Sequence, residues 1–271
     1  MYKIAISDLD GTLLGPDHRM SNQTKESIHR WLQADRKFAI ATGRHHLEAI
    51  NVQNELNQPT YLISSNGARV HNKEGEVILK QNLPAHIAQS ICDIDFDSEV
   101  QVNLFTDTQW HTNFAIEELA GSSLGKNFKH QISDLKTVDK SEIIKIVFWG
   151  EHEKLTIIYE QLQQQLAGKV NLTFSLKQCL EVMDANTNKG AAVHALLKHK
   201  NLTMADTIAF GDGMNDVEML KEVGKPILMA NSQKQLIEAI AGAEMTVSSK
   251  EHGVAVKLDA LLNQDNTNHS K

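Results

Sequence analysis

The chain has 271 residues, of which 41% are hydrophobic and 23% charged, the composition of a globular protein with a sizeable core. Its formal net charge of -7 argues against general binding to nucleic acids or anionic membranes, because both require a basic surface. We find no signal-peptide layout and no run of about 18 apolar residues. The sequence therefore predicts a soluble, cytoplasmic protein.

Strands and helices alternate in the first quarter of the chain. Three short apolar runs predict buried strands, at residues 4–6, 37–41 and 61–64. Helices are predicted between them, the first capped by Ser21 and the second ended by Pro59. This alternation is typical of a parallel sheet with right-handed crossovers. Residues 69–71 and 76–79 then favour a hairpin.

The pattern changes from about Leu83. Alternating strands are predicted around two helices, at residues 100–104, 143–149, 170–174 and 179–183. The first pattern resumes with a helix near Lys189 and a buried strand at 207–210. Final helices are expected from Gln233 and Gly253, and a frayed polar tail from Asn263.

These elements predict an α/β fold with two parts. Residues 1–82 and 184–271 are expected to form a Rossmann-like core, a doubly wound parallel sheet with helices on both faces. Residues 83–183 are expected to form an α+β domain inserted into it. The sequence carries no signal for an oligomeric state.

Polar residues follow several of the predicted strands. Asp8 and Asp10 come directly after the first strand, two residues apart. On extended backbone this spacing points both side chains to one face of the sheet. Two carboxylates at the end of a buried strand favour a hard cation, and Asp oxygens suit Mg²⁺. A solvated, polar strand end is the alternative for this pair alone.

Three later stretches could meet this pair, because the ligand crevice of an open parallel sheet lies outside the carboxyl ends of its strands. Thr42 offers a hydroxyl, and Gly43 offers a backbone N–H at an expected helix start, where anions bind well. Lys189 begins another helix, and Asp212 and Asp216 lie on a glycine-rich loop. Taken singly, these residues could be a helix cap, a solvated surface lysine and turn residues. Their joint occurrence favours metal-assisted phosphoryl transfer.

The sequence resembles the haloacid dehalogenase-like phosphatases in four motifs. These are Asp8-Leu9-Asp10-Gly11-Thr12, Thr42-Gly43-Arg44, Lys189-Gly190 and Gly211-Asp212-Gly213-Met214-Asn215-Asp216. Their order and spacing are similar to those of the Cof-type branch, in which a cap domain is inserted between the second and third motifs. The resemblance implies that residues 83–183 form this cap and govern the choice of substrate.

The resemblance also implies a two-step mechanism. Asp8 would be the nucleophile that forms an aspartyl phosphate, and Asp10 the general acid and then the general base. Mg²⁺ would be held by the Asp8 carboxylate, the Asp10 backbone carbonyl and Asp212, with Asp216 supporting this site. Lys189 would offset the charge of Asp8. The phosphate-binding residues implied are Leu9, Thr42, Gly43, Lys189 and Asn215.

The implied partner is a small phosphate ester, such as a sugar phosphate or a cofactor or nucleotide phosphate. Four residues are candidates to contact its leaving group: Arg44, Asn66, Glu181 and Asp184. Arg44 could instead form only a surface ion pair, and Glu181 could face solvent. Two other functions remain open, a phosphomutase or phosphotransferase of the same fold and a non-catalytic sensor of phosphorylated metabolites. A sensor would not need both Asp8 and Asp10.

Overall fold

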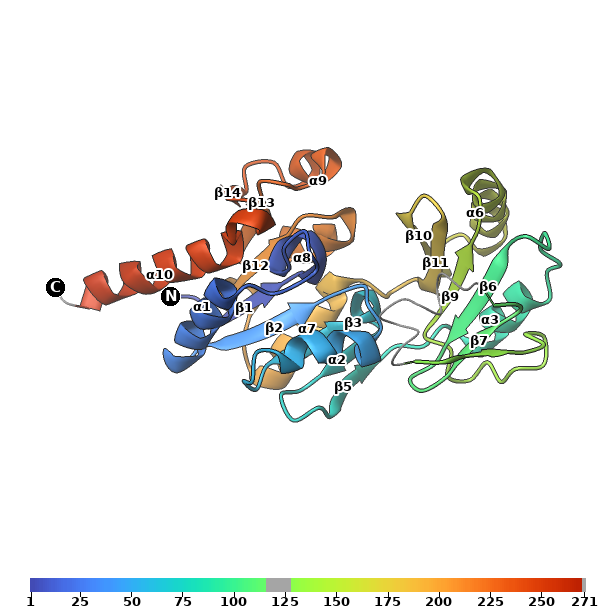
Figure 1. The fold of residues 1–271 in the computed structure, drawn as a ribbon, viewed down its shortest axis with the longest axis horizontal. Helices are drawn as coiled ribbons and strands as arrows, with labels where there is room; N and C mark the ends of the chain where they lie inside the picture. The colour runs from blue at the N-terminus through green and yellow to red at the C-terminus, as the bar shows by residue number, and fades with distance from the viewer. Residues whose placement is uncertain (116–127, 270–271) are drawn as a thin grey trace. The chain divides into compact units, whose positions relative to one another are not determined.

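A computed structural model of the chain describes residues 1–115 and 128–269. The structure divides into two compact units, the first formed by Met1–Lys80 and Asn188–Lys271 and the second by Gln81–Thr187. Figure 1 labels most of their helices and strands. None of the helices in the described ranges combines the length and the apolar character that a membrane crossing needs.

The first unit is built on an eight-stranded sheet. In sheet order its strands are β14 (Glu244–Thr246), β13 (Lys225–Met229), β12 (Thr207–Gly211), β1 (Ile4–Ser7), β2 (Lys37–Ala41), β3 (Tyr61–Ser64), β4 (Arg69–His71) and β5 (Val77–Lys80). Neighbours from β14 to β3 are parallel, whereas β4 and β5 continue the sheet as antiparallel strands. The helices of this unit are α1 (Asn22–Gln33), α2 (His46–Asn54), α7 (Lys189–Lys200), α8 (Val217–Glu222), α9 (Lys234–Ala239) and α10 (Gly253–His269).

Both faces of this sheet are covered, and successive strand residues pack on opposite sides. Ala5 belongs to a cluster with Trp31 of α1 and Leu258 of α10. Ile6 belongs to a second cluster with Leu196 of α7. Side chains of a strand alternate between the two faces, so strands buried on both sides read as continuous apolar runs. The predicted fold class, a doubly wound, Rossmann-like core with an inserted α+β domain, is confirmed.

The C-terminal helix is longer than the sequence predicts. Fraying was expected from Asn263, but α10 continues to His269. The Arg36 Nη2 atom donates a hydrogen bond to Asp265 Oδ2 at 2.5 Å, and its guanidinium lies 4.4 Å from the centroid of the Trp31 ring. This long-range ion pair holds the polar end of α10 against the first unit. The local composition gave no sign of it, because the partner lies 229 residues away.

The second unit is an α+β layer pair. Its six-stranded sheet has the order β10 (Val170–Leu176), β11 (Cys179–Asp184), β9 (Lys145–Trp149), β6 (Gln101–Phe105), β7 (Trp110–Thr112) and β8 (His130–Ile132). The pairs are antiparallel except β7 with β8. Helices α3 (Ala85–Cys92) and α6 (His152–Leu166) share one apolar cluster with Leu104, Phe148 and Leu180. The alternate residues of the same strands therefore face the other side of the sheet.

Candidate active site

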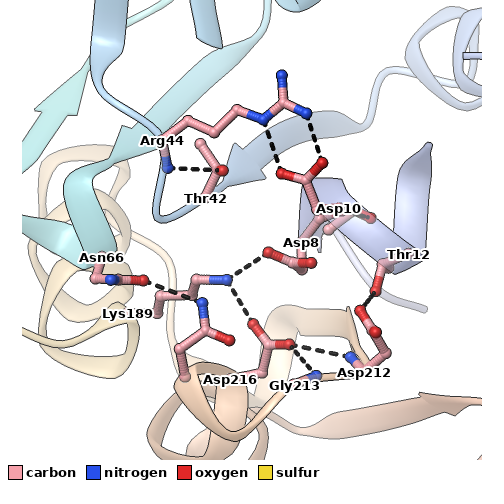
Figure 2. A network of polar contacts seen from close by, with 12 residues as sticks. Asp8, Asp10, Thr12, Thr42, Arg44, Asn66, Lys189, Asp212, Gly213 and Asp216 are labelled. Atoms are coloured by element: carbon pink, nitrogen blue, oxygen red, sulfur yellow. Dashed lines mark hydrogen bonds and ion pairs between the residues drawn. The ribbon is translucent and has the colours of Figure 1, made fainter. Parts of the chain in front are cut away.

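A buried lysine joins two carboxylates in the first unit. Asp8 directly follows β1, Lys189 is the first residue of α7, and Asp216 lies in the turn after β12. The Lys189 Nζ atom is 2.5 Å from Asp8 Oδ1 and 2.6 Å from Asp216 Oδ1 (Figure 2). Lys189 and Asp216 have no exposed surface, and Asp8 is 6% exposed. The alternative of a solvated surface lysine is therefore wrong, and the charge is paired as a buried charge must be.

The pKa shifts in this group follow from burial and from the neighbouring charges. Burial raises the pKa of the Asp8 carboxyl well above its usual value, Lys189 opposes this effect, and Asp216 adds to it. Burial disfavours the ammonium form of Lys189, but Asp216 and Asp8 outweigh it and raise the lysine pKa. Lys189 therefore stays charged, and one cation serves two carboxylates.

A third carboxylate completes an acidic cluster. One oxygen each from Asp8, Asp212 and Asp216 lies within 4.8 Å of the others. Asp216 Oδ2 also accepts hydrogen bonds from the backbone N–H groups of Asp212 (3.0 Å) and Gly213 (3.1 Å). Burial raises the pKa of Asp212 to about 6, and a hydrogen bond from Thr12 partly opposes this shift.

This cluster fits a hard divalent cation. Three carboxylates face one lysine, so positive charge is in deficit, and the donors are all oxygen atoms, which suit Mg²⁺. The sequence placed Asp8, Asp10 and Asp212 around the ion, with Asp10 contributing only its backbone carbonyl. In the structure the three carboxylates of the cluster belong to Asp8, Asp212 and Asp216. The Asp10 carboxylate is not among them, because it pairs with Arg44.

Asp8 and Asp10 do not extend from a common strand. β1 ends at Ser7, and Leu9–Leu13 form a tight turn in which Gly11 has φ +77°. A Cβ atom on Gly11 would lie 2.4 Å from Asp212 Oδ2. Both the positive φ and this lack of space therefore require glycine here. The argument from extended backbone, which placed both carboxylates on one face, is therefore wrong.

The Asp10 carboxylate is instead bound by Arg44. Arg44 Nε and Nη2 lie 2.7 and 2.5 Å from the two oxygens of Asp10 (Figure 2), and Nη1 lies 3.4 Å from Glu48 Oε1. His18 Nδ1 is a more distant neighbour, at 3.4 Å. Burial favours the protonated form of Asp10, but Arg44 outweighs it, so the pKa of Asp10 is lowered. Arg44 is a partner of a predicted site residue rather than a member of an isolated surface pair.

Thr42 lies beneath Arg44 at the end of β2. Its side chain is 1% exposed, and its Oγ1 accepts a hydrogen bond from the backbone N–H of Arg44 at 3.1 Å. The helix start expected at Gly43 is wrong, since α2 begins at His46 with His45 as its N-cap. The Thr42 hydroxyl therefore shapes the turn that precedes the helix, as Thr residues commonly do.

The remaining phosphate-site candidates fall into two groups. Asn215 Nδ2 donates a hydrogen bond to Asn66 Oδ1 at 3.0 Å, and a Cβ atom on Gly43 would also lie 3.0 Å from this oxygen. These three residues are therefore neighbours, although they come from three different loops. Leu9 follows Asp8, and its side chain is wholly buried in the core, so only its backbone is available to a ligand.

Glu181 and Asp184 belong to the second unit. Glu181 is 7% exposed and its Oε2 accepts a hydrogen bond from Lys145 Nζ at 3.1 Å, so the alternative of a solvent-facing Glu181 is wrong. Asp184 ends β11, and its Oδ1 accepts a hydrogen bond from the backbone N–H of Asn186 at 2.9 Å. Within this unit Asp184 therefore holds a turn.

Two residues of the site received no role from the sequence. Thr12 Oγ1 donates a hydrogen bond to Asp212 Oδ1 at 2.7 Å. Asn231 Nδ2 donates to the Gly11 carbonyl at 2.7 Å, and Asn231 Oδ1 accepts from the backbone N–H of Ser249 at 2.9 Å. Thr12 lies inside the first motif, which is the one signal that could have found it.

Comparison with known proteins gives consistent matches along the chain. The family model described as haloacid dehalogenase-like hydrolase matches residues 5–258. A protein of Enterobacter sp. (strain 638) named HMP-PP phosphatase is 36% identical over 270 residues, covering 100% of this chain and 99% of that protein. A protein of the same name from Shigella boydii serotype 4 (strain Sb227) is 39% identical over 236 residues, covering 87% and 91%.

The fold is also shared with a solved structure. The X-ray crystal structure of a Thermotoga maritima protein superposes with a TM-score of 0.84 at 25% sequence identity. The superposition covers 96% of this chain and 97% of that one. The whole two-unit architecture therefore has a counterpart among experimental structures.

Proposed function

The chain belongs to the haloacid dehalogenase-like hydrolases and, within them, to the Cof-type phosphatases, and from this premise we propose that it is a Mg²⁺-dependent phosphatase of small phosphorylated metabolites that acts through an aspartyl phosphate. One observation carries the proposal: the buried Asp8 carboxylate lies 2.5 Å from the Lys189 ammonium and within an acidic cluster that suits a divalent cation. A carboxylate nucleophile with its charge compensated in this way can approach an anionic phosphate.

In the first step, an oxygen of Asp8 attacks the substrate phosphorus. A bond forms between Asp8 and phosphorus as the bond to the leaving oxygen breaks. Asp10, which takes up a proton from solvent before this step, donates that proton to the leaving oxygen. Lys189 keeps the Asp8 oxygen oriented and reduces its repulsion of the incoming phosphate. Thr42, Gly43, Asn215 and the Leu9 backbone are assigned to the transferring phosphoryl oxygens.

In the second step, a water molecule attacks the phosphorus of the aspartyl phosphate. Asp10 takes the proton from this water, phosphate leaves, and the Asp8 carboxylate is restored. Arg44 supports this step because it holds Asp10 ionised and fixes its orientation through two hydrogen bonds. Mg²⁺, when bound by Asp8, Asp212 and the Asp10 backbone carbonyl, would supply charge stabilisation to the phosphoryl oxygens.

The substrate proposed first is the one in the names of the relatives. Two proteins at 36% and 39% identity are called HMP-PP phosphatase, so HMP-PP heads the list, followed by sugar phosphates and cofactor or nucleotide phosphates. The experiment is a phosphate-release assay over this panel with added Mg²⁺. Asp8→Asn should lower kcat by about 10⁴-fold, whereas Asp17→Asn, an exposed aspartate on the following loop, should not. Equal rates for wild type and Asp8→Asn on every compound would contradict the proposal.

Substrate choice is assigned to the second unit, on the sheet face opposite α3 and α6. Several polar side chains on this face are buried and contact one another. Lys145 pairs with Glu181 and lies 5.7 Å from the Phe105 ring centroid. Asn103 Oδ1 accepts a hydrogen bond from Trp110 Nε1 at 2.8 Å. Such preformed polar groups suit the recognition of a leaving group. Glu181→Gln should change the ratio of kcat/KM between two good substrates, and Glu160→Gln on α6 should leave this ratio unchanged.

A further inference from the structure

A second concave region lies in the first unit, away from the acidic cluster. It is a cavity of about 340 Å³. Its walls include Lys37 and Tyr61, which are the first residues of β2 and β3, and Lys200, the last residue of α7. Thr42 and Lys189 lie at the opposite ends of β2 and α7. The cavity is therefore at the amino end of the parallel sheet, whereas the candidate active site is at the carboxyl end.

The cavity concentrates positive charge in an acidic protein. Four cationic side chains line it, Arg36, Lys37, Lys73 and Lys200, and Asp35 is the one acidic residue among the described residues of its wall. The chain as a whole has a formal net charge of -7. Cations gathered around a concave surface focus the potential and raise the local concentration of anions. The residues of the wall therefore carry a net positive charge, although Asp265 pairs with Arg36 and Glu74 with Lys73 from outside it.

Arg36 gives a second, independent observation. Its side chain is 5% exposed, and Asp265 accepts a hydrogen bond from Nη2 only. The Nε and Nη1 atoms are buried and have no hydrogen-bond partner within residues 1–115 and 128–269. Buried N–H groups without acceptors cost free energy, so the single carboxylate of Asp265 leaves part of the donor capacity in this wall unmet. An anion in the cavity would add negative charge close to this guanidinium without contacting the two buried atoms themselves.

We propose that this cavity is a binding site for a small multivalent anion carrying phosphate or carboxylate groups. Its volume is in the range of small-molecule sites, which is about 300–1,000 Å³. Lys200 lies over the Tyr61 ring, 5.8 Å from its centroid, and Lys37 is the first residue of β2. Two of the cations are thus anchored on rigid elements, and the anion bridges them to Arg36 and to the exposed Lys73.

Isothermal titration calorimetry tests this site with two probes, tripolyphosphate and citrate, on Asp8→Asn protein that has been freed of metal by passage over a chelating resin. The double variant Lys73→Gln/Lys200→Gln should weaken the tighter probe about tenfold. The control Lys198→Gln/Lys221→Gln removes two exposed charges from α7 and α8 outside the cavity and should leave the affinity unchanged. The probe that binds more tightly identifies the anion class as phosphate or carboxylate.

Three results would overturn the site. They are the absence of binding up to about 1 mM, which is weak on the usual scale, an unchanged affinity in the cavity variant, and an equal loss in both double variants. The last result would indicate general electrostatic attraction. Because the assay contains neither metal nor turnover, its outcome is independent of the proposed phosphatase activity.

Discussion

Arg44 binds Asp10 through both arms of its guanidinium fork, with Nε at 2.7 Å and Nη2 at 2.5 Å from the two carboxylate oxygens. Such bidentate pairs fix orientation as well as charge. Burial raises the pKa of Asp10, but the contacts with Arg44 lower it by more, so this pKa lies below its ordinary value. The substrate-free protein therefore holds Asp10 ionised and oriented.

Replacing Arg44 should slow the proton-transfer steps that are assigned to Asp10. Arg44→Met should lower kcat/KM for an alkyl phosphate by about tenfold or more, because general acid–base catalysis is worth about 10²–10⁴-fold. The effect on p-nitrophenyl phosphate should be smaller, since its leaving group needs little protonation. The check is a steady-state comparison of both substrates, with Arg19→Met as a control on an exposed arginine. An equal loss on both substrates would show that Arg44 does not act through Asp10.

Lys189 should be a stability residue as well as a site residue. Lys189→Met leaves Asp8 and Asp216 buried without their shared cation, and breaking a buried pair costs about 3–5 kcal/mol. Urea unfolding in EDTA measures this loss, and added Mg²⁺ should recover part of it. Lys189→Arg keeps the charge and should cost less. A Lys189→Met protein as stable as wild type in EDTA would contradict the charge compensation inferred for the cluster.

Thr12 should tune the metal site through Asp212. Thr12→Val removes the Oγ1 donor, 2.7 Å from Asp212 Oδ1, with little change in shape. Partners that hydrogen-bond a metal ligand are typically worth about 10–100-fold in metal affinity, so the Kd for Mg²⁺ should rise by about tenfold. Calorimetric Mg²⁺ titration measures this change. Thr156→Val on α6, a threonine of the second unit, should leave the Kd at the wild-type value.

The pH dependence follows from Asp212. In the metal-free protein its pKa is raised from 3.8 to about 6. Between these values the folded protein binds more protons than the unfolded chain, so the contribution of Asp212 to stability falls as pH rises through this window. Mg²⁺ requires the ionised carboxylate. Below pH 6 the Kd for Mg²⁺ should therefore rise by up to about tenfold for each unit that the pH falls. Mg²⁺ titrations and thermal unfolding at pH 5 and 7.5 test both signs. Asp212→Asn should reduce the pH dependence and leave the part that the raised pKa of Asp8 contributes.

The convergence of the site could be predicted because it depends on topology. Asp8, Thr42 and Asp212 each follow a parallel strand, and such strands present their carboxyl ends at one edge of a sheet. Lys189 could be placed with them because it is the first residue of a helix that begins at this edge. Residue order and strand assignment were sufficient for this part.

The pairings within the site could not be predicted, because they depend on local backbone geometry. Asp10 lies in the turn Leu9–Leu13 and not on β1, and its carboxylate meets Arg44 while Asp8 meets Lys189. Helix α2 starts later than expected because His45 is its cap. A pattern of residue types does not contain these torsion angles.

The central claim is that Asp8 carries the phosphoryl group. The most direct measurement is rapid acid quenching of the protein during turnover of its best substrate, followed by mass spectrometry of the peptide that contains residues 4–14. Wild-type protein should carry a phosphoryl group on Asp8, and Asp10→Asn should both gain and lose this group more slowly, because the two steps lack the acid and the base. Asp8→Asn should carry none. Turnover by Asp8→Asn at the wild-type rate, or a phosphoryl group on another residue, would contradict the account.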